Sequence, residues 1–451
     1  MTLLFKRLCC GLLWLLLVLP AGQARFKWLA EEPLQGAFKP APDATFSWSG
    51  LLANTYQPAL ERSLDDRLGF RALFIRLRNE LSYYGLGESG VNNIVVGRGG
   101  VLFGRDDLDA YLGTDFVGEA VVRRNARRLR AVQDSLARHG TALVFVIAPS
   151  HATCAPESLP SAVRRQPRSR TNAAAYAAEL TAAGVHVLDF SPAFGRWKAR
   201  APYPLFAPGG FHWSMYGGAR AADSLARYLR QTLRVAPAPF RLADDLNVSP
   251  TPRDTDDDLL RTLNLLRAPA SGPLAYPRLD FGPPPAAAPA APAPPAPPKP
   301  NALLVADSFG WTWVYNSFFD NAFSDKSRYW YYNAEVVWPG AERTPEGRDL
   351  GQLKQRAQYL SRQVIVLLFN ERNLVAFDKG FSREVFDIFH PLSAADHARY
   401  DALVAARREQ ATWEESVKEG FERGLSDYAN GVLADERLDR EVPERPAPLK
   451  R

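Results

Sequence analysis

Two short segments of the chain carry side chains that could perform acyl-transfer chemistry together. Asp307 and Ser308 directly follow an apolar run that ends at Ala306. An α/β fold places its ligand sites at such a strand end, where a helix start also offers free N–H groups to an anionic oxygen. His212 stands within the segment GGFHWSMYGG. A serine hydroxyl is a poor nucleophile until an imidazole takes its proton, so Ser308 is the candidate nucleophile and His212 the candidate general base.

Each segment also has a purely structural explanation. Asp307 or Ser308 could cap the helix that follows, and a histidine beside a tryptophan, as in His212-Trp213, is often packed or capping. His151 follows another apolar run and could either line the same cleft or lie in a solvated loop. Neither a metal nor a cofactor is predicted, because the six histidines are dispersed and no ligand spacing occurs.

Two further groups of residues could line the site. Glu371 and Arg372 follow the apolar run 364–369 and are predicted to form an ion pair that supports its rim, with a substrate contact as the other possibility. Six aromatic side chains offer flat faces for sugar rings, although aromatic residues after a strand are more often part of the core. They are Trp311, Trp313, Tyr315, Trp330, Tyr331 and Tyr332.

Apolar runs and helical patterns alternate along the chain. Residues 142–147, 185–189, 302–306 and 364–369 are almost wholly apolar, as strands covered by helices on both faces are. Residues 117–139 and 171–182 have helical spacing and are closed by Gly140 and Gly184. The sequence therefore predicts an α/β fold with a parallel sheet flanked by helices.

The N-terminal region differs from the rest. Residues 1–24 combine Lys6 and Arg7 with an apolar stretch and small residues, which predicts a cleaved export signal, with an uncleaved membrane anchor as the alternative. Residues 25–90 form a lead-in that includes a helix near 72–81, and a hairpin follows at 93–103.

Residues 91–451 are assigned to one α/β domain. The Pro/Ala-rich stretch 283–300 is interpreted as a surface insertion within that domain, because the apolar run after it needs neighbouring strands. Cys154 is the one cysteine after the leader, so no internal disulfide is expected.

The composition bounds the class of protein. With 451 residues, 46% hydrophobic and 23% charged, the chain is globular and long enough to bury a core. Its net charge of +6 includes two leader residues, and its arginines are scattered without a basic stripe interleaved with aromatic residues. These features exclude nucleic acid as the predicted partner.

Several blocks in order along the chain resemble the SGNH-hydrolase-like proteins of the AlgJ/AlgX type. The resemblance implies an SGNH-like fold in the periplasm that transfers acetyl groups onto an exopolysaccharide such as alginate, together with a membrane-bound O-acyltransferase. It also implies Ser308 as nucleophile, His212 as base and Trp213 as the tryptophan after it. The blocks are SLDDRLGFR, NIVVGRGGVLF, VIAPSHATCAPESLP, FHWSMYGGARAADSLARYL, DDDLLRTLNLL, LLVADSFG and VIVLLFNERNL.

The chain departs from the family pattern at two positions. Gly210 stands where the Asp-x-His-Trp motif has its aspartate, and Ala306 stands where the Gly-Asp-Ser turn has its glycine. Asp307 and Asp189 are the candidate supporting carboxylates, Asp189 because it ends a predicted strand.

Three functions remain open at this stage. Acyl transfer through Ser308 is the leading hypothesis. The loss of the motif aspartate favours a non-catalytic scaffold that binds polysaccharide or the membrane acyltransferase, and a carbohydrate esterase would use the same residues with water as acceptor. The polysaccharide, the acyl donor and the oligomeric state are not predicted, and the mature protein is expected in the periplasm, with a membrane anchor if the leader stays.

Overall fold

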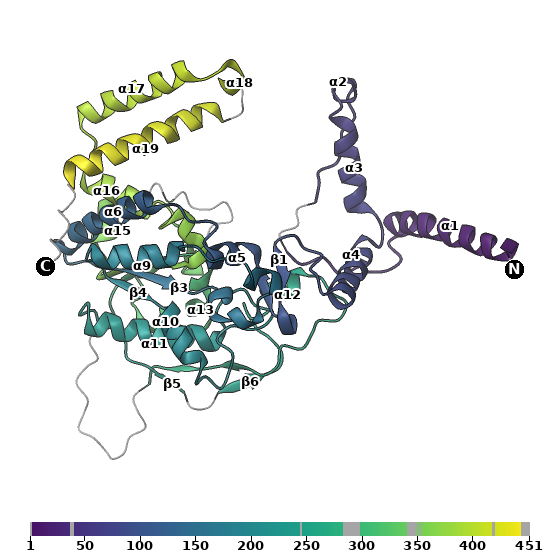
Figure 1. Ribbon diagram of the computed structural model, residues 1–451, viewed down its shortest axis with the longest axis horizontal. Helices are drawn as coiled ribbons and strands as arrows, with labels where there is room; N and C mark the ends of the chain where they lie inside the picture. The colour runs from purple at the N-terminus through teal and green to yellow at the C-terminus, as the bar shows by residue number, and fades with distance from the viewer. Residues whose placement is uncertain are drawn as a thin grey trace, which may run out of the picture.

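A computed structural model describes residues 2–36, 40–243, 246–282, 298–340, 350, 353–416 and 420–442 (Figure 1). Most of the predicted Pro/Ala-rich insertion, at 283–297, lies outside the described residues. The centre of the molecule is a six-stranded sheet in the order β11-β10-β9-β12-β3-β4. Its strands are β3 (Ala142–Ala148), β4 (Val187–Asp189), β9 (Ala302–Ala306), β10 (Arg328–Tyr331), β11 (Glu335–Trp338) and β12 (Val364–Asn370).

All neighbouring strands of this sheet are parallel except β10 and β11, which are antiparallel. The four predicted apolar runs all form strands here, and the expected α/β fold is confirmed. In the register of the central strands, Leu368 lies between Ala306 on one side and Val146 on the other. The carboxyl ends of β9, β12 and β3 therefore meet at one edge of the sheet.

Successive side chains of each buried strand enter opposite cores, which is why the runs are apolar throughout. Leu303 and Val305 pack in one core, and Leu304 and Ala306 pack in the other. The first core is covered by α6 (Glu119–Ala137), α9 (Asn172–Ala182), α15 (Arg356–Leu360) and α16 (Phe381–Phe389). The second is covered by α10 (Ser191–Lys198), α11 (Met215–Gln231), α13 (Trp311–Tyr315) and α14 (Phe318–Ala322).

Smaller elements pack around the sheet. The predicted hairpin is present as β1 (Ile94–Val96) and β2 (Leu102–Gly104), antiparallel and joined by a 3-10 turn in which Gly99 and Gly100 have positive φ. The other elements are α5 (Arg105–Leu112), α7 (His151–Cys154), α8 (Ser161–Arg164), α12 (Asp258–Thr262), and two short antiparallel pairs: β5 (Arg241–Leu242) with β8 (Leu279–Asp280), and β6 (Asn247–Ser249) with β7 (Leu274–Tyr276).

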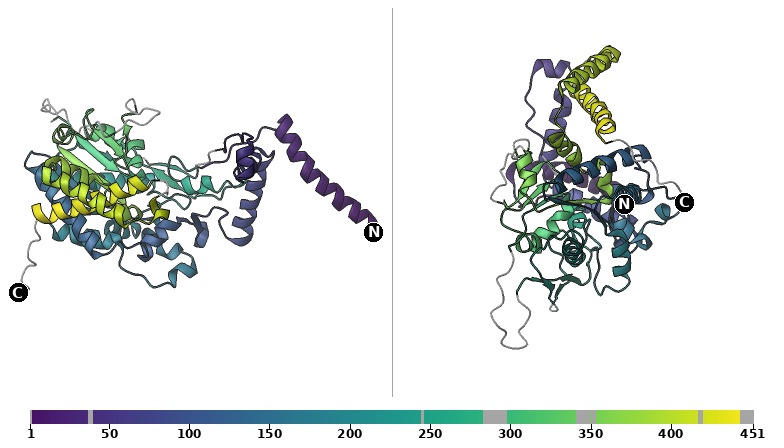
Figure 2. Two further views of the ribbon diagram at one scale, coloured as in Figure 1. Left: turned by 90° about the horizontal axis from the view of Figure 1, so that it is seen from above. Right: turned by 90° about the vertical axis from the view of Figure 1, so that its left-hand side faces the viewer.

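The N-terminal helices extend away from the sheet in Figure 1 and in the left view of Figure 2. They are α1 (Thr2–Phe26), α2 (Trp48–Leu52), α3 (Tyr56–Arg67) and α4 (Arg71–Glu80), and α4 continues into a π-helical turn, Leu81–Leu86. We call residues 27–86 the arm. The predicted leader lies within α1, whose residues Leu3–Phe26 are long and apolar enough to cross a membrane by length and composition. The boundary near residue 90 stays a prediction.

A helical hairpin follows the sheet at the C-terminal end, formed by α17 (Ala394–Gln410), α18 (Trp413–Ser416) and α19 (Phe421–Glu441). It leans on α6 and α16 (Figure 1). Arg128 of α6 pairs with Asp435 at 3.2 Å, and the fully buried Arg437 pairs with Asp387 of α16. These ion pairs hold the hairpin against the domain.

Candidate active site

Ser308 begins a 3-10 turn at the point where β9 ends. Asp307, fully buried, holds this turn: its carboxylate accepts hydrogen bonds from the Phe309 N–H at 3.0 Å, the Asn370 N–H at 2.6 Å and the Asn373 Nδ2 at 2.7 Å. Burial raises the pKa of Asp307, and these three hydrogen bonds oppose the increase. Asp307 therefore positions the turn that bears Ser308. Its carboxylate bonds to this turn and to Asn370 and Asn373, not to His212.

His212 approaches Ser308 from the loop that precedes α11. Its Nε2 lies 2.7 Å from the Ser308 Oγ, a hydrogen-bond distance. Trp213, next in the chain, is fully buried with its ring 5.2 Å from that of Phe309 and 5.7 Å from that of Trp313. The tryptophan therefore anchors the His212 backbone in the core and does not face a ligand.

Asp258 completes the arrangement from the first residue of α12. One of its carboxylate oxygens bonds to His212 Nδ1, and the other accepts the Phe211 N–H at 2.6 Å. Nδ1 then carries the proton and Nε2 is left to accept the proton of the Ser308 hydroxyl, which is the tautomer that a general base requires. Asp258, His212 and Ser308 form one continuous chain of hydrogen bonds.

The structure gives a reason why Gly210 replaces the motif aspartate. A Cβ at this position would lie 3.0 Å from the Asp256 carbonyl oxygen and 3.1 Å from that of Thr255. The segment that delivers Asp258 therefore occupies the space that a side chain at position 210 would need. The imidazole finds its carboxylate 46 residues further along the chain.

His151 supports the loop that bears Gly210 and His212. Its Nδ1 donates to the Gly210 carbonyl at 3.1 Å, and its ring packs between those of Phe103 and Phe206. Burial lowers the pKa of His151 to about 4, which keeps the ring neutral. The expectation of a solvated loop histidine is wrong, and the side chain does not line the cleft described below.

Asp189 does not support His212. Its carboxylate accepts the Ser191 N–H at 2.9 Å and so closes the turn from β4 into α10. Because β4 is the outermost strand on its side, two strands separate it from β9 and Ser308. The role predicted for Asp189 falls to Asp258.

Glu371 and Arg372 do not form the predicted ion pair. The buried Glu371 carboxylate accepts from Ser150 N at 3.1 Å, Thr153 Oγ1 at 2.6 Å and Ser191 Oγ at 2.9 Å. Arg372 points to the other side of the backbone. There its guanidinium lies 2.7 Å from Asp106 and 3.7 Å from the centre of the Phe211 ring, so it supports the loop that bears His212.

Tyr332 lies beside the nucleophile. Burial, together with the nearby Asp307 carboxylate, raises the pKa of Tyr332 and outweighs the opposing effect of the Ser308 and Asn373 side chains, so the phenol stays protonated. The residue has φ of 51°, a rare value for a non-glycine residue and one often found at functional sites. Of the other predicted aromatic residues, Trp313 and Trp330 are core side chains, while Tyr315 is exposed.

A cleft of about 920 Å³ opens at His212 and Asp258. Arg372 and Asp106 line its walls, and Arg71 and Ile75 of α4 close the side next to the arm. Among the described residues, no group of three His, Cys, Asp or Glu side chains could hold a metal ion. His212 and Asp258 are the members of the hydrogen-bond chain that line this cleft.

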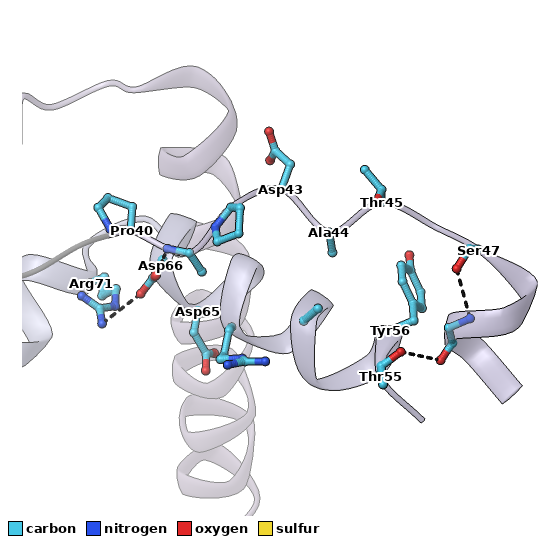
Figure 3. Close-up of a pocket in the computed structure, with 15 residues that line it drawn as sticks. Pro40, Asp43, Ala44, Thr45, Ser47, Thr55, Tyr56, Asp65, Asp66 and Arg71 are labelled. Atoms are coloured by element: carbon cyan, nitrogen blue, oxygen red, sulfur yellow. Dashed lines mark hydrogen bonds and ion pairs between the residues drawn. The ribbon is translucent and has the colours of Figure 1, made fainter. Parts of the chain in front are cut away.

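A second hollow, of about 950 Å³, lies within the arm between residues 40–47 and α3 (Figure 3). Its walls carry Asp43, Asp65 and Asp66, together with Arg71, which pairs with Asp66. None of the three residues of the hydrogen-bond chain reaches it. We assign the site by its chemistry and not by the size of the opening.

The family match agrees with this site. The family model of the SGNH hydrolase-like domain of the acetyltransferase AlgX matches residues 94–326, more than half of the chain. The chain belongs to this family. The matched range includes His212, Asp258 and Ser308, and the predicted resemblance to AlgJ/AlgX-type proteins is confirmed.

Individual relatives are more distant. A stretch of 123 residues is 33% identical to the alginate biosynthesis protein AlgX of Pseudomonas aeruginosa and covers 27% of this chain and 25% of that protein. The chain thus matches about a quarter of this relative's length.

Two solved structures are among the more distant matches to this chain. The O-acetyltransferase domain of Pseudomonas putida AlgJ is 23% identical over 65% of this chain and 99% of that one, with a TM-score of 0.43. The structure of Pseudomonas aeruginosa AlgX is 18% identical over 70% of each chain, with a TM-score of 0.44.

Sequence reasoning missed Asp258, although a signal for it was present. The segment DTDDD at 254–258 places four carboxylates within five residues. Such a run is usually a solvated turn, yet Asp256 and Asp258 both point inward, and burial raises the pKa of Asp256 to about 7. An acidic run that follows a motif lacking its aspartate is the pattern that could have indicated the carboxylate partner of His212.

Proposed function

We propose that this protein transfers acetyl groups to hydroxyl groups of an exopolysaccharide through an acetyl-Ser308 intermediate. The observation that carries the proposal is the chain of hydrogen bonds from Asp258 through His212 to Ser308, at the strand edge where α/β folds bind their ligands. Membership of a family of SGNH-like acetyltransferases supports the choice of acyl group.

The reaction proceeds in two half-reactions. In the first, Ser308 Oγ attacks the acetyl carbonyl carbon while His212 Nε2 takes the hydroxyl proton, and that proton then passes to the leaving group of the donor. In the second, His212 removes the proton of a sugar hydroxyl, whose oxygen attacks the acetyl-Ser308 ester and regenerates the Ser308 hydroxyl. Asp258 holds the imidazole in one tautomer and stabilises its charged form throughout.

Each half-reaction places negative charge on the carbonyl oxygen of the acetyl group. A hydrogen-bond donor must stabilise that charge. The Tyr332 hydroxyl is suited to this role because it lies beside Ser308 and because its raised pKa keeps its proton available. Arg372, on the same side, contributes positive charge to the electrostatic environment of Tyr332.

The family and the first helix support our proposals for the acceptor and the location. The named relative takes part in alginate biosynthesis, and an alginate-like polysaccharide is the acceptor that we propose. The apolar helix α1 supports export to the periplasm, either as a signal or as an inner-membrane anchor. A membrane-bound O-acyltransferase is the proposed source of the acetyl group.

A non-catalytic scaffold is the second candidate function. The absence of the motif aspartate at position 210 favoured this scaffold function. That argument no longer holds, because Asp258 supplies a carboxylate to the His212 imidazole. An esterase remains an alternative to a transferase, since the two differ only in whether water or a sugar accepts the acetyl group.

The experiment that tests the proposal is trapping of the acyl-enzyme. The purified chain is mixed with a small activated acetyl ester, quenched in acid and digested, and the peptide that contains Ser308 is weighed by mass spectrometry. We expect an added acetyl group that is absent in Ser308→Ala and present in Ser361→Ala, a matched change at an exposed serine. Faster turnover with added polysaccharide would identify a transferase. Ester cleavage that persists in Ser308→Ala would contradict the mechanism.

A further inference from the structure

The arm exposes more large apolar side chains than a water-soluble surface usually does. Most of the strongly exposed large hydrophobic residues of the described chain lie in α1 or the arm, at positions 3–86. The remainder of the described chain has them only singly: Val248, Leu266, Tyr315, Val375, Leu392, Trp413 and Tyr428. A concentration of this kind indicates a contact surface.

Within the arm, the exposed residues form a stripe along α4 and its π-helical extension. Leu73, Phe74, Leu77, Leu81 and Tyr84 are separated by steps of one, three, four and three residues, which places them on one face of a helix. Their side chains are between 39% and 68% exposed. We call these five residues the α4 stripe.

Contacts opposite and beside the stripe hold α4 against the rest of the molecule. Asn79 Nδ2 donates to the Leu263 carbonyl at 2.7 Å. The Glu80 carboxylate accepts the Leu266 N–H at 3.0 Å and pairs with Arg267 at 3.0 Å. Tyr84, at the end of the stripe, is bound to the same segment, because its hydroxyl donates to the Arg267 carbonyl at 2.8 Å, whereas Leu73, Phe74 and Leu77 face outward.

The stripe begins next to the end of α1. Gly69, just before α4, packs so closely on the last turns of α1 that a Cβ there would lie 2.3 Å from the Pro20 carbonyl oxygen. Gln23 is buried at this junction and holds the turn after α1 through hydrogen bonds to the Leu29 N–H and carbonyl. The end of a helix that could cross a membrane therefore lies against the start of the stripe (Figures 1 and 2).

We propose that α1 stays in the chain as a membrane anchor and that the α4 stripe lies in the interface of the bilayer that α1 enters, with Leu73, Phe74 and Leu77 among the lipid chains. Lipid is the occupant that fits best, because the stripe continues from a membrane-spanning segment and has the leucine and phenylalanine face of interfacial helices. Trp28, 56% exposed directly after α1, stands where aromatic residues mark a membrane surface.

This placement has a consequence for the cleft. While one side of α4 contacts lipid, Arg71 and Ile75 of the same helix line the cleft that contains His212 and Asp258. The mouth of the cleft would then lie at the membrane surface. The placement does not depend on the catalytic proposal and can fail or hold by itself.

The test measures membrane depth in the full chain. Cys9 and Cys10 are replaced by serine, Cys154 is left because it is buried and burial raises the pKa of its thiol to about 12, and a single cysteine is introduced by Phe74→Cys or Leu77→Cys. Each variant is labelled with a nitroxide and reconstituted into phosphatidylcholine vesicles. The control is Leu392→Cys, an exposed leucine outside the arm.

We expect both arm labels to be accessible to oxygen dissolved in lipid and protected from a water-soluble nickel chelate, while the label at 392 shows the reverse. Unchanged circular dichroism and melting temperature would show that the labelled chains are folded. Arm labels as accessible to the nickel chelate as the control would overturn the proposal. That result would mean that the stripe faces water or is covered by a protein absent from the vesicles.

Discussion

Replacing Asp258, whose carboxylate bonds to His212, should show whether the imidazole depends on a carboxylate at position 258 or at position 210. In Asp258→Asn, one of the two oxygens becomes an amide NH₂ group that cannot accept a hydrogen bond. Because Phe211 N–H and His212 Nδ1 each use one oxygen, only one of them keeps its partner. Either the imidazole turns to the wrong tautomer or a buried backbone N–H is left unpaired.

The expected loss follows from this geometry. The wrong tautomer lowers kcat by about 10³- to 10⁴-fold, equivalent to about 4–5.5 kcal/mol of transition-state stabilisation, as in other serine triads. Gly210→Asp, which restores the family motif, should not repair the site. Its Cβ would lie 3.0 Å and 3.1 Å from two backbone oxygens. Relieving that contact costs about 1–3 kcal/mol of stability and moves Asp258, and a shift of about 1 Å can cost about 10²-fold in rate.

The assay is release of acetate from an activated ester, measured beside urea unfolding for each variant. We expect Gly210→Ala to lose stability and activity as Gly210→Asp does, because both introduce the same Cβ. The reasoning is refuted if Gly210→Asp raises activity where Gly210→Ala lowers it, or if Asp258→Asn retains the full rate. Either result would mean that the carboxylate at 258 does not act on the imidazole.

Three further predictions concern neighbouring groups. Tyr332→Phe should lower kcat for ester cleavage by about 10²-fold or more with little change in KM, while the matched change Tyr331→Phe leaves both near wild type; equal effects would exclude the oxyanion role. Because burial raises the pKa of Asp256 from 3.8 to about 7, the folded state holds a proton that the unfolded chain releases near pH 4, so stability falls as pH rises between these values. Asp256→Asn should therefore gain roughly 2–4 kcal/mol over wild type in urea unfolding at pH 8, and a smaller gain at pH 5; equal gains would contradict the assignment. His151→Phe keeps the ring packing but leaves the Gly210 carbonyl without its donor, and should lower the free energy of unfolding by about 1–3 kcal/mol in urea titrations; an unchanged value would show that this hydrogen bond contributes nothing.

The fold could be predicted from the sequence where one physical rule dominates. The runs 142–147, 302–306 and 364–369 are apolar at every position because helices cover both faces of the sheet, and they are strands in the structure. The hairpin at 93–103 was predictable because glycine permits the positive φ of its turn. The order of strands was not predictable, since nothing local indicates that β12 inserts between β9 and β3.

The candidate site could be predicted only in part, for a related reason. Ser308 and His212 stand at a strand end and in a motif, which are local features of the chain. The path of a loop brings Asp258 to His212. Spacing along the sequence therefore does not indicate that these two residues are partners. Asp189 was chosen because it ends a strand, but β4 lies at the sheet edge, too far along the sheet to reach Ser308.

The position of β12 in the sheet determines which fragments of this protein can be expressed. The family match covers 94–326, and a fragment cut at those residues would contain β3 and β9 but not the strand that pairs with both. It would also lack Asn79 and Glu80, which bind the segment after Asp258. A fragment that keeps the sheet and these contacts therefore has to include α4 and continue beyond β12, past residue 326, where the family match ends.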